Sequence, residues 1–504
     1  MFSIIKSISL DGLKGYIINI QVDVSNGLPC FEIVGLPDIS IRESKERVRT
    51  ALRNSGFEVL SRKTIINLAP ATIKKEGSFF DLPIAIGYLA STGQINKERL
   101  NNVAFVGEIS LDGKINRMTG ILPVCIEARR HGIETIIIPN ENLKEASIID
   151  GINIYGANNL KEVVNFLNYG KTLNEMHTKW EELKSEHQFN IDFAEVKGQH
   201  FAKRAIEIAA AGGHNIILIG NPGCGKTMLA QRITTILPEL TFEESLETTK
   251  IHSIAGKLNE EEQIVFNRPF RTPFHNITKT ALIGGGQYPK PGEISLANYG
   301  ILYLDEITQF NKELLEFLRI PLEDHKVTIS RINTQVTYPC NFMLVASMNP
   351  CPCGYYGSKV KKCTCDDKTI KKYFNKISGP LLDRIDIQVR IPESDYKLIN
   401  TQEENSATIK ERVTRARNIQ FKRYKHESVF NNSSLTPSLI KKYCVLDLNS
   451  KRLLDNAFEK LGLSLRGYNK ILKVARTIAD LEGMEKIQSK HIAEAIQFRN
   501  LDRI

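Results

Sequence analysis

One segment constrains the fold of this 504-residue chain more than any other. Residues 220–227 read Gly-Asn-Pro-Gly-Cys-Gly-Lys-Thr and satisfy the pattern G-x-x-x-x-G-K-[ST] at every fixed position. The apolar run Asn215–Ile219 precedes this segment, and a helical stretch, Met228–Leu237, follows it. A strand, a glycine-rich turn and a helix in this order bind phosphate, because backbone N–H groups and the helix N-terminus face the ligand. The pattern predicts that Lys226 contacts the β- and γ-phosphates of ATP and that Thr227 ligates Mg²⁺.

Two further apolar runs end in polar residues that suit the same chemistry. Ile301–Leu304 leads to Asp305, which we expect to hold Mg²⁺, and to Glu306, which we expect to activate water. Phe342–Ala346 leads to Asn349, an expected orienter of that water. Continuous apolar strands belong to a parallel sheet covered by helices on both faces. The predicted nucleotide-binding residues are Gly220, Asn221, Pro222, Gly223, Cys224, Gly225, Lys226, Thr227 and Asp305.

The pattern of apolar residues divides the chain into four parts. Residues 1–168 alternate short strands and helices, as in an α+β domain, and 169–192 form a polar connector with the only Trp, Trp180. Residues 193–392 form the α/β nucleotide-binding core. Residues 393–504 are predicted to be helical, with helices at 407–425, 450–461, 465–481 and 489–498. The predicted fold class is therefore α/β, with an α+β domain before the core and a helical domain after it.

The charge is uneven along the chain. The formal net charge is +10, and residues 401–504 contribute 20 Lys and Arg against 12 Asp and Glu, a net +8. Much of this charge lies on the expected helix 407–425, where it forms either a solvated face or a surface for DNA or a partner subunit. No apolar run approaches the roughly 18 residues of a membrane span. The N-terminus lacks the apolar core of a secretory signal, so we expect a cytoplasmic protein without a membrane partner.

Four of the nine cysteines are clustered within residues 351–365. Cys351 and Cys353 form one C-x-C pair, and Cys363 and Cys365 form another. Zinc prefers four soft ligands in a tetrahedron, and two pairs of cysteines at the ends of a loop provide them. The alternative is a loop of unpaired thiols. Seven lysines at 359–376 surround this candidate zinc site, which makes the loop a candidate contact for nucleic-acid phosphates.

Taken together, these motifs resemble those of the ComM/YifB family, AAA+ ATPases of the magnesium-chelatase branch. The resemblance also rests on Gly284-Gly-Gly-Gln-Tyr-Pro-Lys-Pro-Gly, Ser378-Gly-Pro-Leu-Leu-Asp-Arg-Ile-Asp and the N-terminal Asn67-Leu-Ala-Pro-Ala, and it extends over essentially the whole chain. It implies an ATP-driven hexameric DNA motor, a helicase or translocase, that promotes branch migration of recombination intermediates during natural transformation.

The family resemblance also assigns roles to residues that spacing alone leaves open. Arg384 resembles the arginine finger that reaches the γ-phosphate of a neighbouring subunit, and Arg466 resembles the sensor-2 arginine. Residues 327–339 resemble a hairpin that projects into the central pore of related motors, with Arg331 as a possible DNA contact.

The N-terminal region resembles the Lon peptidase domain, but without its catalytic dyad. Phe79 stands at the position of the nucleophilic serine, and Leu122 stands at that of the lysine. Since neither side chain supplies a hydroxyl or a base, we expect a peptidase-like fold without peptidase activity. ATP-dependent proteolysis is accordingly disfavoured, and the alternative to a DNA motor is an AAA+ protein-remodelling or metal-chelatase-type chaperone.

Overall fold

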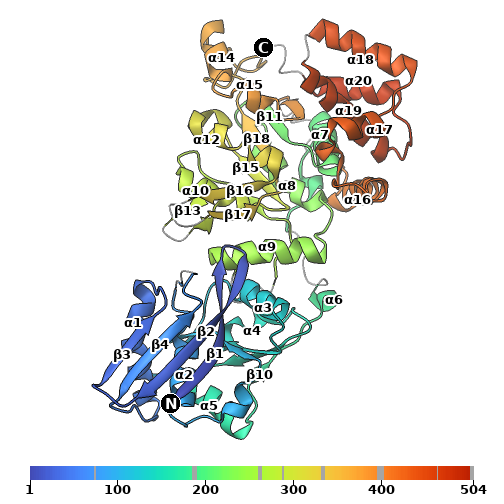
Figure 1. Cartoon of the computed structure of the whole chain (residues 1–504). Coiled ribbons are helices and arrows are strands. Elements are labelled where there is room, and N and C mark those ends of the chain that lie inside the picture. The colour runs from blue at the N-terminus through green and yellow to red at the C-terminus, as the bar shows by residue number, and fades with distance from the viewer. Residues whose placement is uncertain are drawn as a thin grey trace.

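The computed structural model describes residues 1–72, 75, 77–183, 190–258, 264–286, 289–330, 335–393, 402–461 and 464–499. The N-terminal part lies at one end of the long axis of the molecule, and the core sheet with the C-terminal helices beside it lies at the other (Figure 1). Helix α9 (Phe242–Ala255) lies crosswise between the N-terminal part and the rest.

An eight-stranded mixed sheet builds the N-terminal part, in the order β10-β9-β8-β5-β1-β2-β4-β3. Its long central strand β2 alternates buried and outward residues, the period-two pattern of a half-buried strand. The strands are β1 Phe2–Asp11, β2 Lys14–Ser25, β3 Cys30–Val34, β4 Lys63–Ala69, β5 Val103–Phe105, β8 Thr135–Pro139, β9 Asn153–Ala157 and β10 Asn174–Glu175. Its helices are α1 Ile39–Asn54, α2 Asp81–Ser91, α3 Ile121–Arg130, α4 Leu143–Ala146 and α5 Leu160–Tyr169, and a small pair, β6 Glu108–Ile109 and β7 Ile115–Asn116, lies beside them.

A five-stranded parallel sheet forms the core of the central part, in the order β12-β15-β18-β11-β19. The three predicted strands are confirmed as β11, β15 and β18, and every residue in them is buried, which explains their uninterrupted apolar sequences. The strands are β11 Ile216–Gly220, β12 Phe270–Arg271, β15 Ile301–Leu304, β18 Met343–Met348 and β19 Ile387–Ile391. The predicted α/β class is therefore confirmed.

Short helices and hairpins surround this core sheet. The helices are α7 His200–Gly212, α8 Lys226–Ile236, α9, α10 Lys279–Ile283, α11 Glu293–Leu296, α12 Lys312–Phe317, α13 Pro321–Asp324, α14 Asp367–Phe374 and α15 Gly379–Leu382. Two hairpins accompany them, β13 Gly284–Gly285 with β14 Lys290–Pro291, and β16 Lys326–Ser330 with β17 Gln335–Pro339. The tip of the β1–β2 hairpin reaches this second hairpin, because a Cβ placed on Gly12 would lie 2.3 Å from Val336 Cγ1.

The C-terminal part is helical, as predicted. Its helices are α16 Ser406–Arg423, α17 Pro437–Tyr443, α18 Leu448–Leu461, α19 Leu465–Leu481 and α20 Ser489–Gln497. The four predicted helices match α16, α18, α19 and α20 to within two residues at each end, while α17 was not predicted. No described helix is long and apolar enough to cross a membrane.

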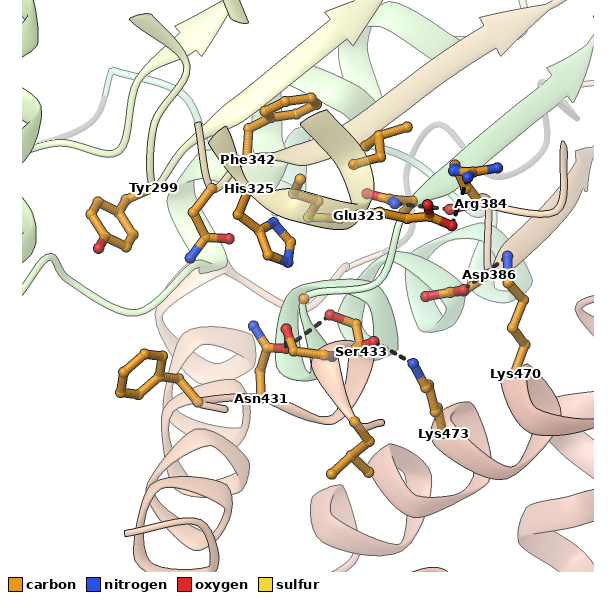
Figure 2. A pocket seen from close by; sticks show the side chains of 18 of the residues that line it. Tyr299, Glu323, His325, Phe342, Arg384, Asp386, Asn431, Ser433, Lys470 and Lys473 are labelled. Atoms are coloured by element: carbon orange, nitrogen blue, oxygen red, sulfur yellow. Dashed lines mark hydrogen bonds and ion pairs between the residues drawn. The ribbon is translucent and has the colours of Figure 1, made fainter. Parts of the chain in front are cut away.

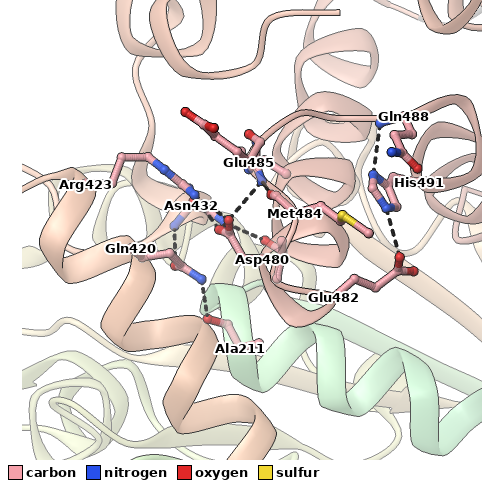
Figure 3. Close-up of polar contacts among 12 residues, drawn as sticks. Ala211, Gln420, Arg423, Asn432, Asp480, Glu482, Met484, Glu485, Gln488 and His491 are labelled. Carbon is pink, nitrogen blue, oxygen red and sulfur yellow. Dashed lines mark hydrogen bonds and ion pairs between the residues drawn. The ribbon is translucent and has the colours of Figure 1, made fainter.

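A buried polar network fastens these helices to the core (Figure 3). Gln420 on α16 donates to the carbonyl of Ala211 on α7 over 3.0 Å. The carboxylate of Asp480 on α19 accepts hydrogen bonds from Arg423 and, over 2.9 Å, from the side-chain amide of Asn432. Buried charges with several partners have a defined geometry, so this network fixes the orientation of the C-terminal helices against the core.

Aromatic packing joins the N-terminal part to α9. Trp180, on the short helix α6 (Trp180–Leu183), stacks on Phe266 with ring centroids 5.1 Å apart and meets Phe242 edge-on at 5.5 Å. The predicted connector 169–192 therefore makes specific contacts, and it contains the edge strand β10 of the first sheet.

Candidate nucleotide-binding site

The phosphate-binding loop, residues 220–227, lies at the carboxyl edge of the core sheet. Strand β11 ends at Gly220 and helix α8 begins at Lys226. Gly223 and Gly225 have φ angles of +78° and +86°, a left-handed conformation that favours glycine. A Cβ on either residue would meet no atom within 4 Å, so open space faces the loop where a phosphate is expected. The loop therefore fits the polyphosphate of a nucleotide.

The side chain of Lys226 lies along this loop. Its ammonium group donates to the carbonyls of Gly220 and Asn221 over 2.7 and 2.9 Å, and to Asn349 Oδ1 over 3.1 Å. Within the described chain, no ion pair joins it to a carboxylate. An ammonium group held by neutral acceptors can still pair with an anionic ligand, which suits the predicted contact with the β- and γ-phosphates.

Asp305 and Thr227, the two expected magnesium ligands, lie side by side. Thr227 Oγ1 donates to Asp305 Oδ2 over 3.2 Å, and the hydroxyl of Tyr303 donates to Asp305 Oδ1 over 2.9 Å. Ser347 also donates to Asp305 Oδ1. Oxygen ligands of this kind suit Mg²⁺, which is usually bound by one or two carboxylates together with substrate phosphates.

Glu306 occupies a strained position beside this pair. Its φ of +48° is left-handed, which is uncommon for a residue other than glycine and is found mainly at functional sites. Its backbone N–H donates to Ser347 Oγ over 3.0 Å, and the side-chain amide of Asn349 lies 3.4 Å from its Oε1. The structure thus brings the predicted base and the predicted water-orienting amide together next to Lys226.

Tyr303 and Ser347 also contact Asp305, and neither was predicted from the sequence. Burial raises the pKa of the Tyr303 hydroxyl, so it remains a neutral donor toward Asp305 and Thr227. Tyr303 and Ser347 each lie near the carboxyl end of a core strand, two positions before a predicted site residue that follows that strand. A polar side chain two residues before a predicted site residue, within an otherwise apolar strand, was the sequence feature that could have identified both residues.

Arg384 and Arg466 lie away from the residues around Lys226. They line a cavity at the opposite edge of the core sheet. The cavity has a volume of about 440 Å³ and lies where β11, β18 and β19 begin, against the C-terminal helices (Figure 2). The guanidinium of Arg384 pairs with Glu323 at 2.6 Å, and that of Arg466 lies 3.9 Å from Asp383. Lys470 and Lys473 of α19 also line this cavity, where Lys470 pairs with Asp386 at 3.2 Å and Lys473 donates to the carbonyl of Ser433 (Figure 2).

The length of strand β11 separates Arg384 from the phosphate-binding loop. The side-chain amide of Asn215, just before β11, donates to the carbonyl of Arg384 over 2.9 Å, so Arg384 is anchored where the strand begins. The five residues of β11 at about 3.3 Å each place the phosphate-binding loop about 16 Å away. An extended arginine side chain is shorter than this span, so Arg384 cannot reach a phosphate bound in its own subunit.

The four predicted metal ligands converge. The sulfur atoms of Cys351, Cys353, Cys363 and Cys365 all lie within 4.8 Å of one another. Three of the separations are 3.3, 3.5 and 3.7 Å, while four sulfurs placed about 2.3 Å from a tetrahedral zinc lie about 3.8 Å apart. The cluster is compatible with zinc.

Most charges on the basic helix α16 bind the protein itself. Lys410 pairs with Glu239 at 3.1 Å, Arg412 with Glu207 at 2.5 Å, and Arg417 donates to the carbonyl of Ala210 over 3.0 Å. The exposed basic residues of this segment are Arg415, Lys422 and Lys425. The candidate DNA-contacting face is therefore smaller than the sequence indicated. Residues 327–330 and 335–339 of the predicted pore hairpin form β16 and β17, while Arg331 lies outside the described residues.

The two Lon-like positions carry apolar side chains that lie in or pack against the hydrophobic core of the N-terminal part. Leu122 is fully buried, and Phe79 packs against two core clusters. The neighbouring Ser78 donates its hydroxyl to Glu108, not to a lysine or histidine. The two positions that hold the Ser–Lys dyad in a Lon peptidase therefore carry apolar side chains here, and the absence of peptidase activity stays a prediction.

The parallel sheet with its phosphate-binding loop and the adjacent acidic strand define a magnesium-chelatase-like AAA+ protein. Residues 192–399 match the family described as magnesium chelatase, subunit ChlI, and residues 20–142 match the family described as subunit ChlI of Mg-chelatase. Residues 403–499 match the magnesium chelatase subunit ChlI C-terminal family. This class of AAA+ protein implies ATP and Mg²⁺ as ligands.

Whole-chain relatives narrow the class to one family. Competence protein ComM of Haemophilus influenzae is 40% identical over 506 residues, covering 98% of this chain and 96% of its own. The uncharacterized protein YifB of Escherichia coli is 40% identical over 505 residues, covering 100% and 98%. The chain belongs to the ComM/YifB family. Lon protease 2 of Bacillus subtilis is 30% identical over 171 residues, 30% of either chain, and the likeness to Lon concerns the N-terminal region.

Proposed function

We propose that this protein is an ATP-driven DNA motor that works as a hexameric ring and promotes branch migration of recombination intermediates, as in natural transformation. The observation that carries this proposal is the separation of the two halves of the site. Lys226, Asp305 and Glu306 lie at the carboxyl edge of the sheet, while Arg384 and Arg466 lie at the amino edge. A complete site needs two subunits, which is the arrangement of a ring ATPase.

Each residue has a defined role in this proposal. Lys226 and the loop N–H groups bind the β- and γ-phosphates, and Thr227 with Asp305 would hold Mg²⁺, which neutralises charge on the phosphates. Glu306 accepts a proton from the attacking water, and Asn349 orients that water. Arg384 from the neighbouring subunit stabilises the negative charge that develops on the γ-phosphate, and Arg466 assists.

The DNA role rests on one relative and on basic surfaces of this chain. The relative from Haemophilus influenzae is a competence protein by name. The lysines around residues 359–376 and the exposed Arg415 and Lys422 offer phosphate contacts that do not depend on sequence. We therefore assign branched or single-stranded DNA as the partner. The cytoplasmic location expected from the sequence is part of the same proposal.

The test is ATP hydrolysis with and without branched DNA, in the wild type and in Lys226→Ala. We expect branched or single-stranded DNA to stimulate hydrolysis in the wild type, and we expect no hydrolysis in Lys226→Ala. Hydrolysis that DNA leaves unchanged, but that a protein partner stimulates, would favour the alternative of a remodelling or metal-insertion chaperone.

A further inference from the structure

The four-cysteine loop, residues 351–365, touches the phosphate-binding loop directly. Gly354 has a φ of +85°, and a Cβ on it would lie 2.8 Å from both Cγ and Cδ of Pro222. Only glycine allows this close approach of the two loops, for reasons of both backbone conformation and space. The contact joins the second residue after β11 to a residue directly after Cys353.

A carboxylate makes a second connection between the same loops. Glu393, just after β19, accepts a hydrogen bond from the side-chain amide of Asn221 over 2.6 Å. The same oxygen accepts a hydrogen bond from the hydroxyl of Ser358. Asn221 belongs to the phosphate-binding loop and Ser358 to the four-cysteine loop, so Glu393 holds one loop against the other.

The two ends of the four-cysteine loop lie beside the catalytic groups. Asn349, which binds Lys226 over 3.1 Å, precedes the fully buried Cys351 by two residues. After Cys365 the chain enters α14, whose Tyr373 accepts a hydrogen bond from Thr308 over 2.7 Å. Thr308 follows Glu306 by two residues, so both ends of this loop are connected to the segments that follow β15 and β18 at the nucleotide site.

The loop has little else to hold its shape. Residues 351–365 contain no helix or strand, and Cys351 is the one fully buried side chain among them. Val360 is 85% exposed. A segment that buries so little apolar surface depends on another constraint, and a metal bound by four thiolates supplies one.

We propose that the metal held by Cys351, Cys353, Cys363 and Cys365 braces the phosphate-binding loop, so that metal occupancy sets the affinity of this protein for ATP. The metal is zinc or another thiophilic divalent ion. Glu393 is a positioning residue that transmits the constraint, and it contacts no phosphate. This inference rests on the proposed nucleotide site.

The experiment uses the full-length protein with two readouts other than hydrolysis. Metal content is measured by mass spectrometry, and the dissociation constant is measured with a fluorescent, methylanthraniloyl-labelled ATP in the presence of Mg²⁺. We expect Cys363→Ser to lose the metal and to bind this nucleotide about tenfold more weakly, the equivalent of one hydrogen bond to a charged group. Cys30→Ser, at a thiol of the N-terminal sheet, is the matched control and should leave both values unchanged.

A second variant separates the brace from the metal itself. Glu393→Ala should retain the metal and still weaken nucleotide binding several-fold, because the connection between the loops is broken downstream of the cysteines. Unchanged nucleotide affinity in a metal-free, folded Cys363→Ser would overturn the proposal, and so would a wild type purified without metal that binds ATP tightly. A metal-loaded wild type that binds no nucleotide would refute the proposed nucleotide site itself, and the coupling with it.

Discussion

The position of Arg384 makes the strongest prediction, which concerns cooperation between subunits. Arg384 is anchored about 16 Å from the phosphate-binding loop of its own chain, the length of the five-residue strand β11. Replacement of Arg384 by alanine should therefore leave nucleotide binding intact and lower kcat about 10³-fold, the lower bound for the loss of an arginine finger. Lys226→Ala should instead abolish nucleotide binding.

A mixture of these two inactive variants tests the arrangement directly. An active site in a mixed ring needs Lys226 from one subunit and Arg384 from its neighbour. In a ring assembled at random from equal amounts, each of these conditions holds for half of the subunits. About a quarter of the interfaces should then be complete, so the mixture should recover about 25% of wild-type ATPase activity.

The assay measures steady-state phosphate release after the variants have been mixed and allowed to exchange subunits, with native mass spectrometry to verify mixed rings. Either variant alone, treated in the same way, is the control. Mixed rings without activity would refute the inference that the site is shared, and so would an Arg384→Ala variant that hydrolyses ATP at the wild-type rate.

Four other substitutions test separate parts of the structure. Tyr303→Phe removes the hydroxyl shared by the two expected magnesium ligands and should raise the Mg²⁺ concentration needed for half-maximal hydrolysis about tenfold, measured by titration. Asp480→Asn leaves two buried guanidinium groups without a counter-charge and should lower the free energy of unfolding in urea by about 3–5 kcal/mol, whereas the exposed Asp455→Asn should have little effect. Arg415→Glu should weaken DNA binding and reduce its salt slope by about 1, and an unchanged slope would count against a DNA contact there. Arg417→Glu should instead destabilise the protein, because this guanidinium donates to a carbonyl in the last turn of α7.

The residues expected to bind phosphate and magnesium were largely predictable from the sequence. A phosphate-binding loop is a local structure, made by a strand, a turn and a helix that are consecutive in the chain. Asp305 and Asn349 could be added because parallel strands end at one edge of a sheet, whatever their order. Tyr303 and Ser347 were missed because their role depends on which face of each strand meets the neighbouring loop.

The basic residues of α16 show that the sequence alone does not predict which surface charges are paired within the folded protein. Its basic residues were expected to form one solvated or DNA-binding face. In the folded protein several of them are partners of acidic residues far away in the chain, such as Glu207 and Glu239. The sequence shows where the charges lie along the helix but not which of them face a carboxylate from another element.

The sequence by itself determined the family, the parallel core sheet, the phosphate-binding loop and the four candidate metal ligands, because each is encoded in short runs or in period-two and helical patterns. Only the tertiary structure decided that Arg384 lies a full strand length from the loop, and that the four-cysteine loop packs on Pro222. Those relations depend on the strand order β12-β15-β18-β11-β19 and on contacts between segments more than 100 residues apart. Spacing along the chain carries no record of such contacts, because they form only when the sheet and the helices pack together.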